Sequence, residues 1–427
     1  MSVPGLVGPL HFTYMMVVFG YLFGYIIIAN VLLPTYYRMN LTSIYSYLEN
    51  RLGFWSYKTG AFYFILSRVI GASFRLFIVV NVLQTFVFDA WGVPFWITVS
   101  IFILLILLYT YKGGVKTIVW TDTLQTTFML LAVIISVLLI LNHTGWSLSS
   151  VISRITNDGY TQIINNDWRT KSFFLKHFFG GMFIAIAMTG LDQEMMQKNI
   201  SVKTLKDSQK NMYIFSIVLV FINLLFLFLG ALLYLFAHSK NLIIPLPGKE
   251  DNLFPMIALN YLGIAAGVFF IIGLISAAYP SADGALTALT SSFCIDFLGL
   301  KKKNWPEIKK RNIRYTVHVS FAIILLMLIV IFRMINDEAV ISELFTIAGY
   351  TYGPLLGLYS FGLLSKRSLH DRFVPLVCIL SPVICYFLNE HSVNWLNGYK
   401  FGFELLILNG ALTFFGLLII SINRKAI

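Results

Sequence analysis

The sequence predicts an all-α polytopic membrane protein with about eleven transmembrane helices, and both its composition and the length of its apolar runs support that prediction. Hydrophobic residues make up 58% of the 427-residue chain and charged residues only 12%, whereas about 25% of the residues of a soluble domain are charged. A soluble fold has too little interior to bury this much apolar surface. The composition therefore argues against a disordered protein, a secreted disulfide scaffold and a soluble nucleic-acid-binding protein.

Apolar runs of about 20 residues, the length that crosses a bilayer as a helix, recur along the whole chain. The predicted spans are 10–34, 59–84, 95–111, 118–142, 174–193, 211–238, 265–297, 313–332, 339–364, 372–389 and 401–422. The first, third and sixth contain no Asp, Glu, Lys or Arg. The second, fourth, fifth and seventh contain ionisable side chains, which are costly at membrane depth and therefore mark candidate functional positions.

The distribution of basic residues predicts the orientation. The connections between the spans fall into two alternating sets, and the first set holds 35–58, 111–117, 194–210, 298–312, 365–371 and the C-terminus. Roughly 21 of the 31 Lys and Arg residues belong to it, so the positive-inside rule places it in the cytoplasm. The sequence thus predicts a multi-pass protein of the cell membrane with a cytoplasmic C-terminus.

A polar segment opens the fourth span. The Gly-Gly pair at 113–114 leads into a helix that carries Asp122 and Gln125 in its first turns. Residues three apart lie on one face of a helix, so these two side chains can act together. Two interpretations stay open: Asp122 is a cation ligand, or it caps the helix or pairs with a lysine of a loop.

Small and polar residues also run through the seventh span. Pro280 and Gly284 are expected to interrupt its helix and free backbone carbonyls, while Ser281, Asp283 and Thr287 supply hydroxyl and carboxylate oxygens. Oxygen ligands without imidazole or thiolate favour sodium over a transition metal. Close helix packing is the alternative. It accounts poorly for Asp283, because a lone carboxylate in a packing seam is costly.

Two arginines share one face of the second span, because Arg68 and Arg75 are seven residues apart. A bidentate pair with a substrate carboxylate is one role for Arg75. An internal salt bridge, for example to Asp122, Asp283 or Glu404, is the other.

The fifth span ends in a polar segment. Gly190 is followed by Asp192 and Gln193, which indicates a helix that breaks or ends there.

Three of these segments resemble motifs of the sodium:solute symporter family. Tyr109–Gln125 is similar to its signature Y-x-x-x-G-G-x-x-x-x-x-W-T-D-x-x-Q. Ser276–Asp296 resembles the family's sodium-site helix, roughly A-A-x-M-S-T-A-D-S-x-L-x-x-x-S-S followed by an aspartate, and Thr189–Lys198 resembles its sixth core helix, of type G-x-N-Q-x-x-x-Q-R. The resemblance extends over essentially the whole chain.

The resemblance implies a five-plus-five inverted repeat with broken first and sixth core helices. On that template, residues 1–427 form a single transporter domain, with core helices two to ten at about 10–364 and two extra helices at about 372–422. Met1–Gly5 is similar to the family motif at the break of core helix one. The first two helices of the family pattern are therefore expected to be missing from the N-terminus.

The resemblance also implies the sodium ligands. The main site of the family uses a carbonyl that maps to Ala277 and hydroxyls that map to Pro280 and Ser281, so the proline leaves the site one side-chain oxygen short. A second site, present in some members, includes the residue that maps to Asp122, and its partners on core helix eight map to Asp283 and Gly284. The substrate of such members lies between core helices one, two, three and six. The candidates there are Tyr14, Arg75, Phe183 and Asp192.

These expectations describe a sodium-coupled secondary active symporter that imports a small organic solute by alternating access. Arg75 motivates the hypothesis that this solute is a carboxylate. Sodium is the expected coupling ion, no organic cofactor is expected, and paired carboxylates leave proton coupling open. The expected partners are the solute and the lipid bilayer, not nucleic acid.

Other classes of function have less support in the sequence than transport. No Ser/His/Asp set, His-rich metal cluster or Gly-rich phosphate loop in the sequence indicates an enzyme. Two alternatives share the fold: a truncated form that does not transport, and the membrane sensor domain of a signalling protein.

Overall fold

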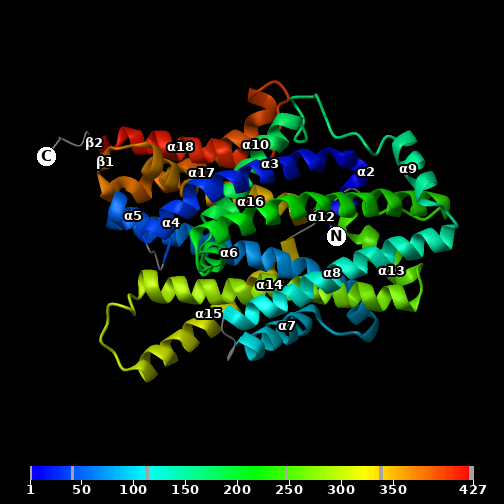
Figure 1. The fold of residues 1–427 in the computed structure, drawn as a ribbon, viewed down its shortest axis with the longest axis horizontal. Coiled ribbons are helices and arrows are strands. Elements are labelled where there is room, and N and C mark those ends of the chain that lie inside the picture. Colours follow the sequence, from blue (N-terminus) through cyan, green and yellow to red (C-terminus); the bar gives the residue numbers. More distant parts are fainter. Residues whose placement is uncertain (1, 40–42, 111–114, 247, 336–339, 423–427) are drawn as a thin grey trace.

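Long helices make up nearly all of the structure, a computed structural model (Figure 1). It describes residues 2–39, 43–110, 115–246, 248–335 and 340–422, while the side chains of 109, 115–121, 278–281, 335 and 340–344 lie outside that description. Helices are expected throughout, because in lipid every backbone N–H and C=O must find a partner within the protein.

The first helices are α1 (Ser2–Gly5), α2 (Val7–Leu10), α3 (Tyr14–Ile27), α4 (Leu33–Met39), α5 (Ser46–Arg51), α6 (Phe54–Leu83), α7 (Phe95–Thr110), α8 (Val115–Thr144) and α9 (Leu148–Asn157). The later helices are α10 (Phe174–Ala185), α11 (Gln193–Ile200), α12 (Leu205–Ser239), α13 (Leu253–Asn260), α14 (Ile264–Ser292), α15 (Glu307–Ile335), α16 (Val340–Leu364), α17 (Val374–Trp395) and α18 (Leu405–Ile419). Short 3-10 or π segments extend them at His11–Thr13, Ile28–Leu32, Gln84–Phe88, Asp89–Trp91, Ile186–Gly190, Glu250–Asn252, Phe293–Phe297 and Asp371–Phe373. Strands β1 (Ser368–Leu369) and β2 (Ser421–Ile422) form an antiparallel pair in which Ser368 lies opposite Ile422.

The predicted all-α membrane class is confirmed, and a helix lies at each predicted span. Within the described residues, seven helices are long and apolar enough to cross a membrane, or eight if one bent pair counts as a single span. The helices at Phe95–Leu108 and Leu405–Ile419 are apolar but shorter. In Figure 1, α4, α5 and the β1–β2 pair lie at one end of the bundle, and α9 and α13 lie at the other. This arrangement agrees with the two predicted sets of connections.

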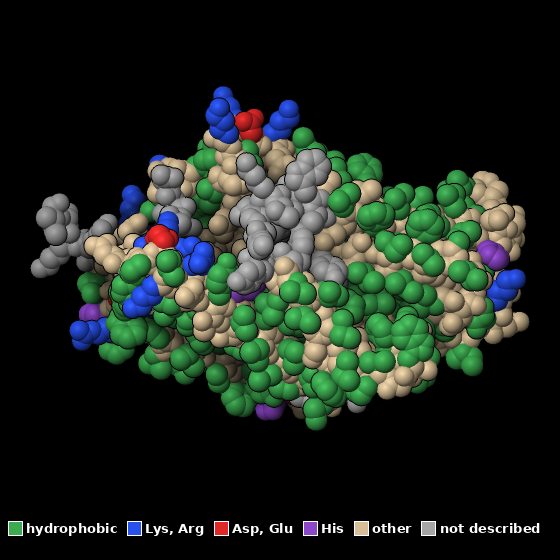
Figure 2. All heavy atoms as spheres, turned by 90° about the horizontal axis from the view of Figure 1, so that it is seen from below, with side chains coloured by type: hydrophobic (Ala, Val, Ile, Leu, Met, Phe, Trp, Pro, Cys, Tyr) green, Lys and Arg blue, Asp and Glu red, His purple; other side chains and the backbone are tan. Residues whose placement is uncertain are grey.

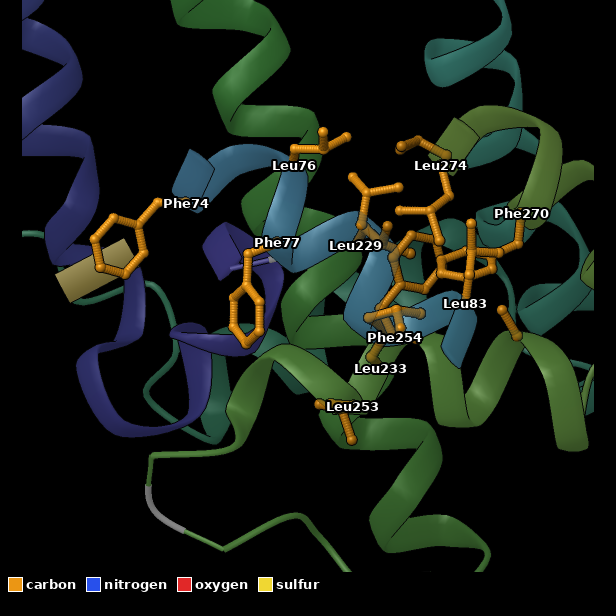
Figure 3. Packing of buried hydrophobic residues seen from close by; sticks show 14 of the residues in the cluster. Phe74, Leu76, Phe77, Leu83, Leu229, Leu233, Leu253, Phe254, Phe270 and Leu274 are labelled. Carbon is orange, nitrogen blue, oxygen red and sulfur yellow. The ribbon is translucent and has the colours of Figure 1, made fainter. Parts of the chain in front are cut away.

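The surface and the interior are both apolar. The face shown in Figure 2 is largely hydrophobic, and most of the Lys and Arg side chains visible on it lie in its left half. Inside, helices α6, α12, α13 and α14 pack through the buried side chains labelled in Figure 3. These include Leu76, Phe77, Leu83, Leu229, Leu233, Leu253, Phe254, Phe270 and Leu274. An apolar exterior around an apolar core is what a lipid environment requires.

Two local predictions about helix breaks have opposite outcomes. The break near Gly190 is present, because the chain turns by 69° between Phe174–Gly190 and Gln193–Ile200. The interruption predicted at Pro280 and Gly284 is wrong, because α14 continues through both residues. Membrane helices tolerate proline where neighbouring groups take up the freed carbonyl.

Small residues bring α3 and α10 close together. A Cβ built on Gly24 of α3 would lie 2.7 Å from the Cβ of Ala185 on α10, which is closer than side-chain carbons pack. Gly267 of α14 differs, because the nearest atom to its added Cβ is the Cδ2 of Leu259 at 3.4 Å. Close backbone approach through small residues is typical of membrane helix pairs.

We therefore expect Gly24→Ala to lower the free energy of unfolding by about 1–3 kcal/mol, the usual effect of overpacking. Gly267→Ala is the matched control and should be neutral or slightly stabilising, because alanine suits a helix better than glycine. Thermal unfolding of the detergent-purified variants measures both effects. Equal melting temperatures for the two variants would contradict the close α3–α10 contact.

Candidate functional site

Two cavities meet at Arg75 of α6. The first has a volume of about 660 Å³, and its lining includes Tyr21 and Tyr25 of α3 and Lys198 of α11. The second has a volume of about 410 Å³, and its lining includes Ala277 of α14. Arg75 lines both. Cavities of about 300–1,000 Å³ are the size that holds small molecules.

Arg75 is partly buried, and no described residue forms a hydrogen bond or ion pair with it. The predicted salt bridge to Asp122, Asp283 or Glu404 is therefore wrong for the described structure. An arginine at membrane depth is costly and normally has a partner. Its unpaired guanidinium, at the junction of two cavities, provides a binding position for an anion.

Arg68, two turns earlier on the same face of α6, is instead part of a buried ion-pair network. Its side chain is 2% exposed, its Nη1 atom lies 3.6 Å from Oδ2 of Asp192, and its Nη2 atom contacts the carboxylate of Glu194. The break between α10 and α11 positions both acids. Asp192 caps α11 by accepting hydrogen bonds from the backbone N–H groups of Glu194 and Met195 at 3.0 and 3.1 Å.

Asp192 is thus fully engaged by protein groups. Besides capping α11 and facing Arg68, its Oδ2 atom accepts a hydrogen bond from the hydroxyl of Tyr352 at 3.3 Å. Its side chain is completely buried. These contacts show that Asp192 positions the start of α11. Its contact with the substrate stays a prediction.

A second group of carboxylates surrounds Lys198 at the end of α11. The Nζ atom of Lys198 lies 2.9 Å from Oδ2 of Asp122 on α8 and 3.2 Å from Oε1 of Glu194. Asp283 of α14 is completely buried beside this group, and the charges of Asp122 and Lys198 both act on it. The neighbouring Gly284 makes room for Glu194, since a Cβ there would lie 2.6 Å from the Glu194 carboxyl carbon.

The predicted sodium ligands fall into two places. Asp122 pairs with Lys198, which lies in α11 and not in a loop, and the charges of both act on Asp283; the sodium-ligand role of the two carboxylates stays a prediction. Ala277 lines the 410 Å³ cavity with Arg75. Ser281 lies in α14, but its side chain is outside the described part of the chain.

The predicted substrate residues are also divided. Arg75 lines both cavities, whereas Tyr14 and Phe183 are absent from the described linings. Tyr14 reaches the 660 Å³ cavity only through Tyr21, whose hydroxyl lies 3.1 Å from its own. The sequence interpretation missed Tyr21 as well as Tyr25. Tyr21 follows Tyr14 by seven residues and Tyr25 follows Tyr21 by four, so all three lie on one face of α3. This spacing was the signal in the sequence.

Glu194 and Lys198 were also missed as site residues. They are four residues apart on α11, which is the spacing of an intrahelical ion pair. That pattern alone does not distinguish them from a solvent-exposed pair. Only the fold places them against Asp122 and Arg68.

Comparisons with known proteins identify relatives of this chain. A family model described as the sodium:solute symporter family matches residues 1–370. The sodium/sialic acid symporter SiaT of Proteus mirabilis (strain HI4320) is 22% identical over 340 residues, which are 79% of this chain and 68% of that protein. Sodium-coupled monocarboxylate transporter 1 of Mus musculus is 26% identical over 353 residues, 81% of this chain and 56% of that protein. The chain thus spans little more than half to about two thirds of the length of these relatives.

A solved structure has the same fold. It is the substrate-bound outward-open state of a Na⁺-coupled sialic acid symporter, and it superposes with a TM-score of 0.83 at 17% sequence identity. The match covers 99% of this chain and 87% of that one. At this level of identity the likeness establishes the fold.

Proposed function

The chain belongs to the sodium:solute symporter family, and from that premise we propose that it couples the uptake of a small organic carboxylate to the sodium gradient. It is a multi-pass membrane protein, and we place its basic loops and C-terminus on the cytoplasmic side by the positive-inside rule. The relatives above are named for sialic acid and monocarboxylates. Both are acids, so a carboxylate is the chemistry that they share.

The unpaired guanidinium of Arg75 is the observation that carries the proposal. A charged group in a membrane-embedded cavity is stabilised when a carboxylate binds it, and the planar guanidinium matches the two carboxylate oxygens. Tyr21, Tyr25 and Thr189 line the 660 Å³ cavity and add hydroxyl groups. Hydroxyls next to a cation suit a polar, anionic solute.

We place the coupling sodium ion on α14 near Ala277 and Ser281. Pro280 has no N–H to donate to the carbonyl of Ser276 one turn earlier, so that oxygen is available to a cation. Ala277 and Arg75 line the same 410 Å³ cavity. A sodium ion there adds positive charge to the wall that the solute carboxylate approaches, so each ligand raises the affinity of the other by the same factor.

Alternating access then follows from the broken helix. The turn of 69° between α10 and α11 lies beside the 660 Å³ cavity, and in this fold one group of helices rocks against the other around the central site. Asp122 and Asp283, the other two predicted sodium ligands, are not assigned to the coupling sodium ion, because Asp122 pairs with Lys198.

The test is uptake by the purified chain in proteoliposomes. We expect labelled lactate or sialic acid to accumulate under an inward sodium gradient and not under a matched potassium gradient. The methyl ester of the same solute, which lacks the negative charge, is the control and should not accumulate. Equal uptake in sodium and potassium, or equal uptake of acid and ester, would contradict the proposal.

A further inference from the structure

The carboxylate cluster formed by Asp122, Glu194 and Asp283 contains an ammonium group supplied by the chain itself. Lys198 reaches from the last turn of α11 to Asp122 on α8, and its Nζ atom lies 2.9 and 3.2 Å from the oxygens of Asp122 and Glu194. The side chain of Glu194 is 6% exposed, and Asp283 is completely buried. The side chains of Lys198 and Asp122 are 26% and 27% exposed, so the ammonium lies at the edge of a cluster whose other two carboxylates are buried.

The same cluster has the chemistry of a cation site. Oδ1 of Asp122, Oε1 of Gln125 and Oδ2 of Asp283 are buried and have no hydrogen-bond partner in the described structure. Carboxylate and amide oxygens without donors are the ligands that hard cations take. Leaving such acceptors unpaired in a buried place is costly. These oxygens have no donor even with Lys198 in place, so its ammonium supplies positive charge to the cluster through Asp122 and Glu194 and not through a hydrogen bond to them.

We propose that the Lys198 ammonium is the resident cation of this cluster, so that the protein binds one coupling sodium ion and not two. The proposal rests on the sodium coupling proposed above and deepens it by assigning the ion stoichiometry. Sodium and the ammonium compete for Asp122, because one carboxylate oxygen cannot hold both at contact distance. Lys198 is tethered to α11, so its pairing with Asp122 is intramolecular and does not depend on an ion concentration in solution.

Geometry also links the cluster to the transport cavity. Lys198 lines the 660 Å³ cavity that contains Arg75, and Glu194 joins it to Arg68. The pairing of Lys198 with Asp122 therefore connects α11, the second half of the broken helix, to α8. Lys198 maintains this contact between α11 and α8 without an ion from solution.

The experiment is a sodium titration of the full chain purified in detergent, followed by tryptophan fluorescence at constant ionic strength with potassium as the replacement ion. The wild-type protein should titrate with a Hill slope of one. Lys198→Met removes the ammonium but keeps the length of the side chain. It should raise the slope towards two and lower the sodium midpoint by at least about tenfold, because a unit charge no longer opposes the entering ion.

Three variants complete the test. Lys198→Arg keeps a cation and should titrate like the wild type, as should Lys206→Met, which removes an exposed lysine from the start of α12. Asp122→Asn should leave the wild-type sodium midpoint unchanged, because sodium does not use that carboxylate while Lys198 holds it. This variant keeps Lys198 in place, so it tests the proposal even if Lys198→Met does not fold.

A lower sodium affinity in Asp122→Asn, or an unchanged titration in folded Lys198→Met, would overturn the proposal. Failure of the proposed function gives a different result, since the wild-type protein would then show no sodium response at all. In that case the resident-cation proposal still requires a sodium response to emerge in Lys198→Met, and it is overturned if none does.

Discussion

Replacing Arg75 by glutamine should reduce the uptake of a carboxylate solute by about 100-fold without destabilising the protein. Losing one partner of a buried charge pair costs about 2–5 kcal/mol of binding, and each 1.4 kcal/mol is a factor of ten. The stability should not fall, because no described residue pairs with Arg75. Removing the guanidinium of Arg75 therefore leaves no carboxylate without its ion-pair partner.

Initial uptake rates in proteoliposomes measure the first effect, and thermal unfolding of the same preparation measures the second. Arg154→Gln is the matched control. Arg154 is exposed on α9, where its guanidinium packs over Trp146 at 4.7 Å, so its loss should leave uptake unchanged. A stable Arg75→Gln variant with wild-type uptake would remove Arg75 from the substrate site.

Replacing Arg68 by methionine should have the opposite profile, a large loss of stability. The guanidinium of Arg68 compensates two buried acids, Asp192 and Glu194. Breaking a buried ion pair by removing one partner typically costs about 3–5 kcal/mol, since the other charge stays buried. That is a large part of a typical folding free energy of about 5–15 kcal/mol.

Arg75→Met is the control for this variant, because it makes the same substitution two turns further along the same helix. We expect a normal melting temperature for Arg75→Met and a strongly lowered one, with poor recovery from the membrane, for Arg68→Met. Adding Glu194→Gln to Arg68→Met should restore part of the loss by removing one stranded charge. An Arg68→Met variant as stable as the wild type would contradict the assigned network.

The contrast between these arginines explains where sequence reasoning succeeds in this chain. Their spacing of seven places both on one face of α6, and this follows from helix geometry alone. Which of them is paired depends on α11, a segment more than 110 residues further along the chain. Asp192 lies at the start of that helix and pairs with Arg68, whereas its charge acts on Arg75 without forming an ion pair with it. No local sequence pattern shows which of the two arginines has an ion-pair partner.

The same holds for the predicted ligands. Asp122 and Asp283 stand out in the sequence because carboxylates in apolar spans are rare, and the fold does bring them together. The sequence interpretation did not include Lys198 in their site, because a lysine near a helix end is ordinary in a membrane protein. It also predicted a broken helix at Pro280 and Gly284, where α14 is continuous and the glycine accommodates Glu194.

Composition, the length of the apolar runs and local motifs are enough to predict the membrane class, the positions of the spans and the family. Which charges neutralise one another, and which one faces a cavity, depends on how the helices pack. Electrostatic pairing depends on distances of a few ångströms between helices that are remote in the chain. For this reason Arg68 and Arg75, equivalent in the sequence pattern, are a structural ion pair and a candidate solute-binding group.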